Sequence, residues 1–217
     1  MSTENTANAE FLRDVATHEL TIIREDGLYR HLRFKRPGTS CMFFDLITWP
    51  GHLCYTGDMG TYVFQRIEDM LEFFRRETKG EDLPINPSYW SEKVIAVDGG
   101  RSAGSVFEYD HQKFLDAVMD YQGDWLEGLS EEHQAELKEA VWDDVLQWAD
   151  EHDEHGNYRR VYDFSAEVGG REYQFTDILE RSMRRFTDRY IWCCRALVWG
   201  IGKYDAATQP TEQEQQP

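Results

Sequence analysis

Glycine-containing turns between residues 19 and 65 limit what the first part of this chain can fold into. The turns are Asp26-Gly27, Pro37-Gly38, Pro50-Gly51 and Gly57-Asp58-Met59-Gly60. The intervals between them are rich in Ile, Phe, Tyr and Thr, which favour β-strands. This spacing predicts an antiparallel meander of short strands.

Apolar residues at helical spacing predict helices after the meander. One series ends before Lys79-Gly80, and the others cover residues 114–125, residues 137–148 and a long C-terminal stretch, 176–203. The sequence therefore predicts an α+β fold in which an antiparallel sheet of short strands packs against about four helices. Two of these helices are an acidic amphipathic helix and a long C-terminal helix. The tryptophans of these segments are expected to form a large aromatic core: Trp125, Trp142, Trp148, Trp192 and Trp199.

A second hairpin is predicted between residues 161 and 175. Apolar and polar residues alternate up to Gly169-Gly170, and the alternation resumes at Tyr173. A two-residue turn at these glycines would pair Ala166 with Tyr173 and Phe164 with Phe175 on one apolar face.

The ends of the chain are polar and lack periodicity. We therefore expect residues 1–8 and 208–217 to be disordered and residues 9–207 to form one domain, with a soft boundary near residues 80–105, where prolines and glycines gather. Residues 1–8 show no secretory signal, and the most apolar window, 191–201, is shorter than the roughly 20 residues of a membrane span. These features predict a cytoplasmic protein that does not insert into membranes.

The negative charge is concentrated in one segment. Of a net charge of −18, residues 108–154 contribute 16 acidic side chains against only Lys113 and Lys138. Such a balance opposes direct binding to nucleic acid or to anionic membranes, because attraction to phosphate supplies most of that affinity.

Within this segment, acidic residues recur at steps of four, three, four and seven, which places them on one ridge of a predicted helix. The members of the ridge are Glu132, Glu136, Glu139, Asp143 and Asp150, with Asp144 beside them. A solvated face that promotes solubility would have the same pattern. The functional alternative is a surface for a host protein with a basic surface. One carboxylate per roughly 5 Å is too sparse for one helix to imitate DNA, which has one phosphate per roughly 3.4 Å of each strand.

A second hypothesis is a pocket for a small ligand or nucleotide near the turns between Trp49 and Tyr62. Its candidate residues are Trp49, His52, Asp58, Tyr62 and Trp90. Tight hairpin geometry explains the same glycines, which do not follow phosphate-loop or dinucleotide spacing.

A third hypothesis is a hydrolase using His52 and Asp58. No complete catalytic, metal-ligand or cofactor motif is present, so we predict no catalytic residues, no metal and no cofactor, and a non-enzymatic protein is favoured. The sequence leaves the oligomeric state open.

Three parts of the sequence resemble a group of acidic proteins carried by tailed phages, prophages and mobile elements of bacteria. The matching residues are Ile47 to Leu53 with Gly57 to Tyr62, then Ser88 to Trp90, then Ala196 to Asp205. The resemblance supplies no catalytic residues. It implies an accessory protein in the bacterial host cell that acts on host machinery, for example a component of defence or of nucleic-acid handling.

Overall fold

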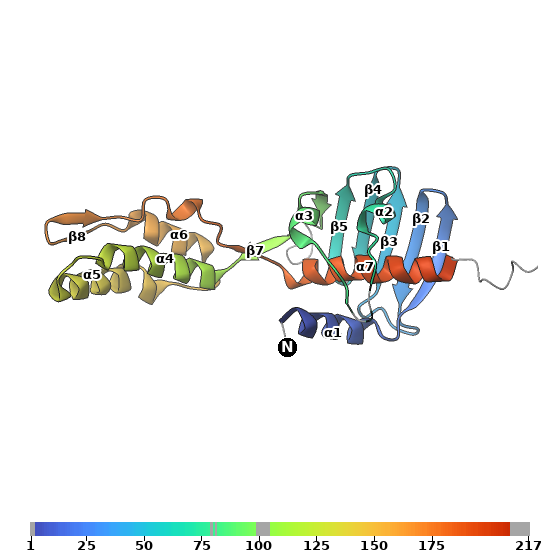
Figure 1. Cartoon of the computed structure of the whole chain (residues 1–217), viewed down its shortest axis with the longest axis horizontal. Coiled ribbons are helices and arrows are strands. Elements are labelled where there is room, and N and C mark those ends of the chain that lie inside the picture. The colour runs from blue at the N-terminus through green and yellow to red at the C-terminus, as the bar shows by residue number, and fades with distance from the viewer. Residues whose placement is uncertain (1–2, 79, 81, 99–104, 209–217) are drawn as a thin grey trace, which may run out of the picture. The chain divides into compact units, whose positions relative to one another are not determined.

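A computed structural model of the chain describes residues 3–78, 80, 82–98 and 105–208. The chain forms two compact units (Figure 1): unit 1 comprises Met1–Val106 and Phe186–Pro217, and unit 2 comprises Phe107–Arg185. The predicted α+β class is confirmed. The predicted single domain is not, because unit 2 is inserted into unit 1 near residue 106, just beyond the predicted soft boundary.

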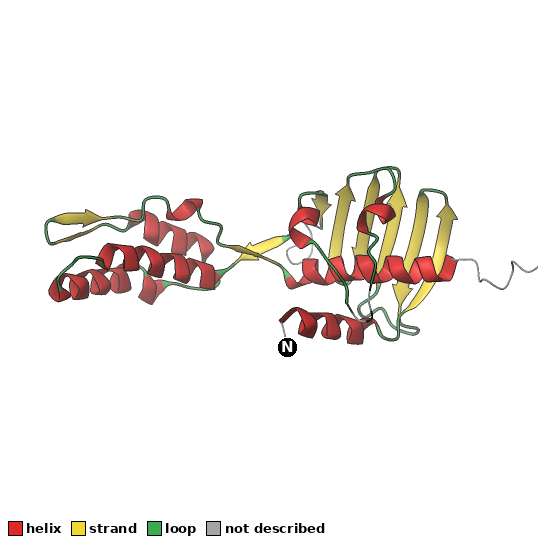
Figure 2. Ribbon diagram, in the orientation of Figure 1, coloured by secondary structure: helices red, strands yellow, loops and turns green. Residues whose placement is uncertain are grey.

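Unit 1 contains a six-stranded antiparallel sheet whose strands follow one another in sequence order (Figure 2). The strands are β1 (Glu19–Asp26), β2 (Tyr29–Lys35), β3 (Phe44–Trp49), β4 (His52–Gly57), β5 (Gly60–Gln65) and β6 (Val94–Val97). The first five strands confirm the predicted meander. Each turn glycine cited above, except Gly57, has a positive φ, which costs glycine little.

One face of this sheet is fully buried. Its aliphatic and aromatic side chains alternate along β2 to β5 and are 0% exposed: Leu32, Phe34, Phe44, Leu46, Leu53, Tyr55, Tyr62 and Phe64. Helix α7 (Asp188–Thr208) packs on them through Trp192 and Trp199, whose rings lie 5.7 and 6.2 Å from that of Phe44. We call this the inner face.

Three further helices pack with this core. Helix α1 (Thr3–Val15) places Phe11 4.9 Å from the ring of Trp192. Helices α2 (Met70–Phe74) and α3 (Pro87–Ser91) meet where the Phe74 ring lies 5.0 Å from those of both Phe64 and Trp90. Asp69 caps the N-terminus of α2 by accepting from Leu71 N, and the helix ends at Phe74, earlier than the predicted end before Lys79.

Unit 2 is mainly helical and has its own core. It contains α4 (His111–Leu126), α5 (Glu131–Asp144), η1 (Leu146–Trp148), α6 (Glu154–Asp163), β8 (Ala166–Val168), β9 (Arg171–Tyr173) and η2 (Ile178–Glu180). Strands β7 (Phe107–Tyr109) and β10 (Arg184–Phe186) form a separate two-stranded sheet. The pairing of Ala166 with Tyr173 confirms the predicted hairpin register.

Several predicted boundaries are wrong. Residues 3–8 are helical rather than disordered, and buried Asn8 accepts a hydrogen bond from Arg195 Nε at 2.7 Å. The hairpin begins at Ala166 and not at residue 161, because the residues up to Asp163, which were predicted to be in a strand, belong to helix α6. The C-terminal helix begins at Asp188 instead of near 176, after η2 and β10. The predicted disordered tail lies outside the described residues, apart from Thr208, which ends α7.

Gly57 offers a test of the close approach between strands β3 and β4. A Cβ atom at this position would overlap the carbonyl oxygen of Phe43 and lie 2.7 Å from Phe44 Cα. Both obstacles are backbone atoms, so Gly57→Ala is expected to lower the free energy of unfolding by about 1–3 kcal/mol in urea titrations. Gly202→Ala is the matched control, because a Cβ atom added there would meet nothing within 4 Å and alanine favours helix α7. Equal effects of the two substitutions would contradict this interpretation.

Candidate functional site

The acidic residues of α5 face solvent. Glu132, Glu136, Glu139, Asp143 and Asp144 are all exposed, and none forms an ion pair with any other residue that the structure describes. The opposite side of the helix explains this orientation, because Leu137 and Val141, one helical turn apart, are 0% exposed. The carboxylates are thus left uncompensated within the described part of unit 2.

Asp150 does not belong to the same helical ridge, which corrects the prediction. Helix α5 ends at Asp144, where the side chains of Gln147 and Trp148 donate to the carbonyl oxygen of Asp143. These two hydrogen bonds satisfy a backbone carbonyl oxygen in the last turn of the helix, where intrahelical donors are missing. Helical periodicity in the sequence does not reveal such a cap. Asp150 instead bonds through its backbone N and O to the side chain of buried Asn157, at 3.1 and 2.6 Å.

Two tryptophans lie exposed beside these carboxylates. Trp142 on α5 is 57% exposed and Trp148 in η1 is 59% exposed, so the expectation that both belong to the core is wrong. Trp125 does pack in unit 2, with its ring 4.7 Å from that of Phe175. The Trp148 indole N–H donates to Asp143 O at 2.9 Å, which fixes the ring in place. We define the acidic-aromatic surface as Glu132, Glu136, Glu139, Trp142, Asp143, Asp144 and Trp148.

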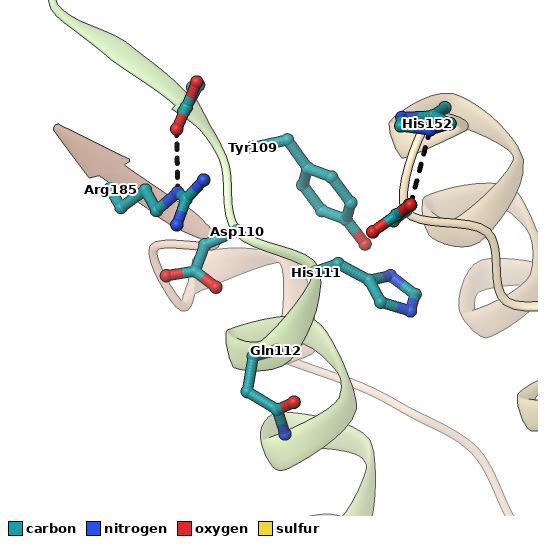
Figure 3. A pocket seen from close by; sticks show the side chains of 8 residues that line it. Tyr109, Asp110, His111, Gln112, His152 and Arg185 are labelled. Atoms are coloured by element: carbon teal, nitrogen blue, oxygen red, sulfur yellow. Dashed lines mark ion pairs between the residues drawn. The ribbon is translucent and has the colours of Figure 1, made fainter. Parts of the chain in front are cut away.

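A polar pocket of about 440 Å³ lies elsewhere in unit 2, at the N-terminus of α4 (Figure 3). It is lined by Glu108, Tyr109, Asp110, His111, Gln112, Glu151, His152 and Arg185. Arg185 Nε lies 2.8 Å from Glu108 Oε1, and the dashed line at Arg185 in Figure 3 marks this pair.

Most polar groups of this pocket already have structural partners. Asp110 caps α4 by accepting from Lys113 N, and the Tyr109 hydroxyl accepts from Asn157 Nδ2 at 2.9 Å. Burial raises the pKa of Tyr109, which opposes a role for its phenolate. His111 stacks on Phe114. The described lining therefore holds no nucleophile paired with a base, and we assign it no reaction.

The alternative ligand residues are only partly brought together. Trp49 and His52 face each other across the β3–β4 turn, with ring centroids 5.0 Å apart and an interplanar angle of 10°. His52 Nδ1 donates to Pro50 O at 2.9 Å, since a carbonyl oxygen can only accept. This pair is a fixed aromatic platform at one end of the sheet.

The other members of the predicted pocket lie elsewhere. Asp58 follows β4, so about 20 Å of extended chain separates it from His52, and its carboxylate accepts from Met42 N. Tyr62 and Trp90 are 0% exposed in the core of unit 1. The five residues do not line one pocket, and His52 and Asp58 are too far apart to act as a catalytic pair.

A charged cluster that sequence reasoning missed lies on the opposite, outer face of the sheet. Asp45 is 4% exposed and accepts from Arg33 Nε and Nη2 at 2.9 and 2.8 Å, and from His31 Nε2 at 2.8 Å. Burial alone would raise the pKa of Asp45, but the hydrogen bonds from Arg33 and His31 outweigh it and hold the pKa below its ordinary value. The period-two pattern could have placed these three residues on one face, but it does not give the cross-strand register.

Two classes of site find no support among the described residues. No group of three or more His, Cys, Asp or Glu side chains is placed to hold a metal ion, and no described helix has the length and apolarity to cross a bilayer. No protein-family model, curated protein or solved structure matches this chain.

Proposed function

We propose that unit 2 is a protein-binding module whose acidic-aromatic surface docks onto a basic patch of a partner protein. One observation carries this proposal: two tryptophans are more than half exposed among carboxylates that have no ion-pair partner in the described structure. A surface that served only solubility would need the charges but not the large exposed rings.

The two kinds of side chain would play different roles in binding. Exposed tryptophans are frequent hot spots, and they also attract Arg and Lys side chains through cation–π contacts. Surrounding carboxylates mainly accelerate association and select cationic partners. Unit 2 has 21 acidic and 8 basic residues, so its long-range field favours a basic partner.

The phage-type resemblance suggests where the partner is found. We infer that the partner is a protein of the bacterial host cell, in keeping with an accessory protein that acts on host machinery. Because α5 ends at Asp144, its row of carboxylates is shorter than the sequence predicted. Recognition of a protein surface by charge and aromatic contact therefore fits better than imitation of a DNA duplex.

The test compares capture of host proteins by two variants with capture by the wild-type chain. Trp142→Ala with Trp148→Ala keeps every charge, whereas Glu132, Glu136, Glu139 and Asp143 all changed to lysine keeps both rings. The double tryptophan variant is expected to weaken binding of the captured partner at least about a hundredfold, since each of two hot-spot residues contributes about 2 kcal/mol or more. The lysine variant is expected to weaken it as well, because like charges would then face each other across the interface. Binding of the purified partner should also weaken with rising salt.

The control reverses the same number of charges in unit 1. Its substitutions to lysine fall at exposed acidic residues: Glu19, Glu68, Glu77 and Asp82. This variant has the same net charge as the α5 variant, so it is expected to retain partner binding. If the control loses the partner equally, net charge and not the acidic-aromatic surface is responsible, and the proposal fails. It also fails if neither test variant changes binding.

A further inference from the structure

The outer face of the sheet in unit 1 carries a groove that is independent of the acidic-aromatic surface. Its volume is about 540 Å³, which is within the usual range for small-molecule sites. The groove is lined by Ile23, Arg24, Tyr29, Arg30, His31, Ile47, Thr48 and Trp49. It therefore spans strands β1, β2 and β3.

The charge of this lining is opposite to that of the protein. The chain has 41 acidic and 23 basic residues, yet the described lining contains two arginines and no carboxylate. Strand alternation places the Arg30 side chain on the inner-face side with Leu32, where Asp69 holds it through hydrogen bonds of 3.0 and 2.9 Å, so Arg24 is the arginine whose charge can reach a ligand in the groove. Among the described acidic residues, Arg24 pairs only with exposed Asp26, at 3.1 Å, and such surface pairs exchange readily. The groove consequently favours an anionic group near Arg24.

The rings of the groove favour a planar ligand. Trp49 is held by its stacking on His52, while Tyr29 is 46% exposed and lies under the Arg24 guanidinium, 5.2 Å from it. Exposed Ile23 and half-buried Ile47 add apolar surface to the lining of the groove. A heterocyclic ring can stack on such side chains, which are already positioned before binding.

His31 supplies a polar group of defined character. Its Nε2 must carry a proton, because the Asp45 carboxylate that it contacts also binds Arg33 and acts as an acceptor. In the neutral ring Nδ1 is then an acceptor, and it has no hydrogen-bond partner among the described residues. An N–H group on a ligand ring could donate to it.

From these features we propose that the groove binds a mononucleotide-class ligand, a planar heterocycle that carries a phosphate. The heterocycle stacks against Trp49 and hydrogen-bonds to His31, and the phosphate pairs with Arg24. This proposal does not depend on the protein-binding role of unit 2.

The test is calorimetric titration of the full chain with AMP, GMP, CMP and UMP at low salt. At least one is expected to bind with a Kd below about 1 mM, and about tenfold more tightly than both its nucleoside and ribose 5-phosphate. Trp49→Ala and Arg24→Gln should each weaken binding about tenfold. His31→Gln, which can still donate to Asp45, should weaken it by removing the Nδ1 acceptor.

The matched control is Trp148→Ala, which removes an exposed tryptophan from unit 2 and should leave nucleotide binding unchanged. If a groove variant misfolds, amide chemical shifts of the wild-type chain provide the second measurement, and changes on nucleotide addition should centre on β1 to β3. The absence of binding by all four nucleotides, tight binding of ribose 5-phosphate alone, or shift changes centred elsewhere would each overturn the proposal.

Discussion

Phe44→Ala is expected to lower the free energy of unfolding by about 3–5 kcal/mol, the usual cost of deleting a buried phenylalanine ring. Phe44 is 0% exposed at the centre of the inner face. Its ring stacks on Phe34 at 4.7 Å and on Tyr55 at 5.6 Å, and it meets Trp192 and Trp199 of α7. Removal of the ring therefore leaves a cavity at the contact between the sheet and its principal helix.

Urea unfolding followed by near-ultraviolet circular dichroism measures this effect in unit 1. Tyr162→Ala is the control, because Tyr162 is 77% exposed and its ring makes little contact with a core. The control should change stability by no more than about 0.5 kcal/mol. A loss below about 1 kcal/mol for Phe44→Ala would show that the aromatic cluster does not hold α7 to the sheet.

Asp45→Ala is expected to destabilise unit 1 by about 2–3 kcal/mol. The substitution removes a buried carboxylate that accepts three hydrogen bonds and leaves Arg33 without its counter-ion. Loss of one member of a buried pair costs about 3–5 kcal/mol, but the Arg33 side chain is 42% exposed and can recover hydration. The expected cost is therefore smaller than for a pair that is buried on both sides.

The effect of Asp45→Ala should depend on pH in a defined direction. The pKa of Asp45 in the folded protein lies below its ordinary value of 3.8, so the stabilising contribution is complete above about pH 4. It is lost as the pH falls through the lower, folded-state pKa, and the stability difference between wild type and variant should shrink there. Denaturant titrations between about pH 3 and 7 check this prediction.

Asp26→Ala provides the comparison for Asp45→Ala. Asp26 also pairs with an arginine, but the Arg24 and Asp26 side chains are 58% and 73% exposed. Such pairs usually contribute less than about 1 kcal/mol. A cost for Asp45→Ala no greater than that of Asp26→Ala would contradict the structural role assigned to the buried carboxylate.

Local sequence patterns were sufficient where neighbouring residues decide the structure. The turns around Gly27, Gly51 and Gly60 predicted the meander, because residues that tolerate a positive φ stand where strands reverse. Gly169-Gly170 likewise predicted the pairing of Ala166 with Tyr173. The sequence also predicted which side of α5 carries the negative charge. Leu137 and Val141 are apolar and mark the buried side of the helix, so the carboxylates on its other side are exposed.

The candidate sites depended more strongly on contacts between distant residues. Helical periodicity shows that Trp142 lies on one side of α5, but it cannot show whether another element covers that side. The same limit made Trp49, Asp58 and Tyr62 look like neighbours, although β4 separates the first two and the inner face buries the third.

The sequence by itself determined the fold class, the order of the first five strands and the location of the acidic segment. Only the tertiary structure decided that unit 1 is completed by α7 after the insertion of unit 2, that Trp142 and Trp148 are exposed, and that Asp45 is buried between His31 and Arg33. The reason is that turn chemistry and periodicity act over a few residues. Burial and cross-strand register arise from residues far apart in the chain, whose meeting no local pattern records.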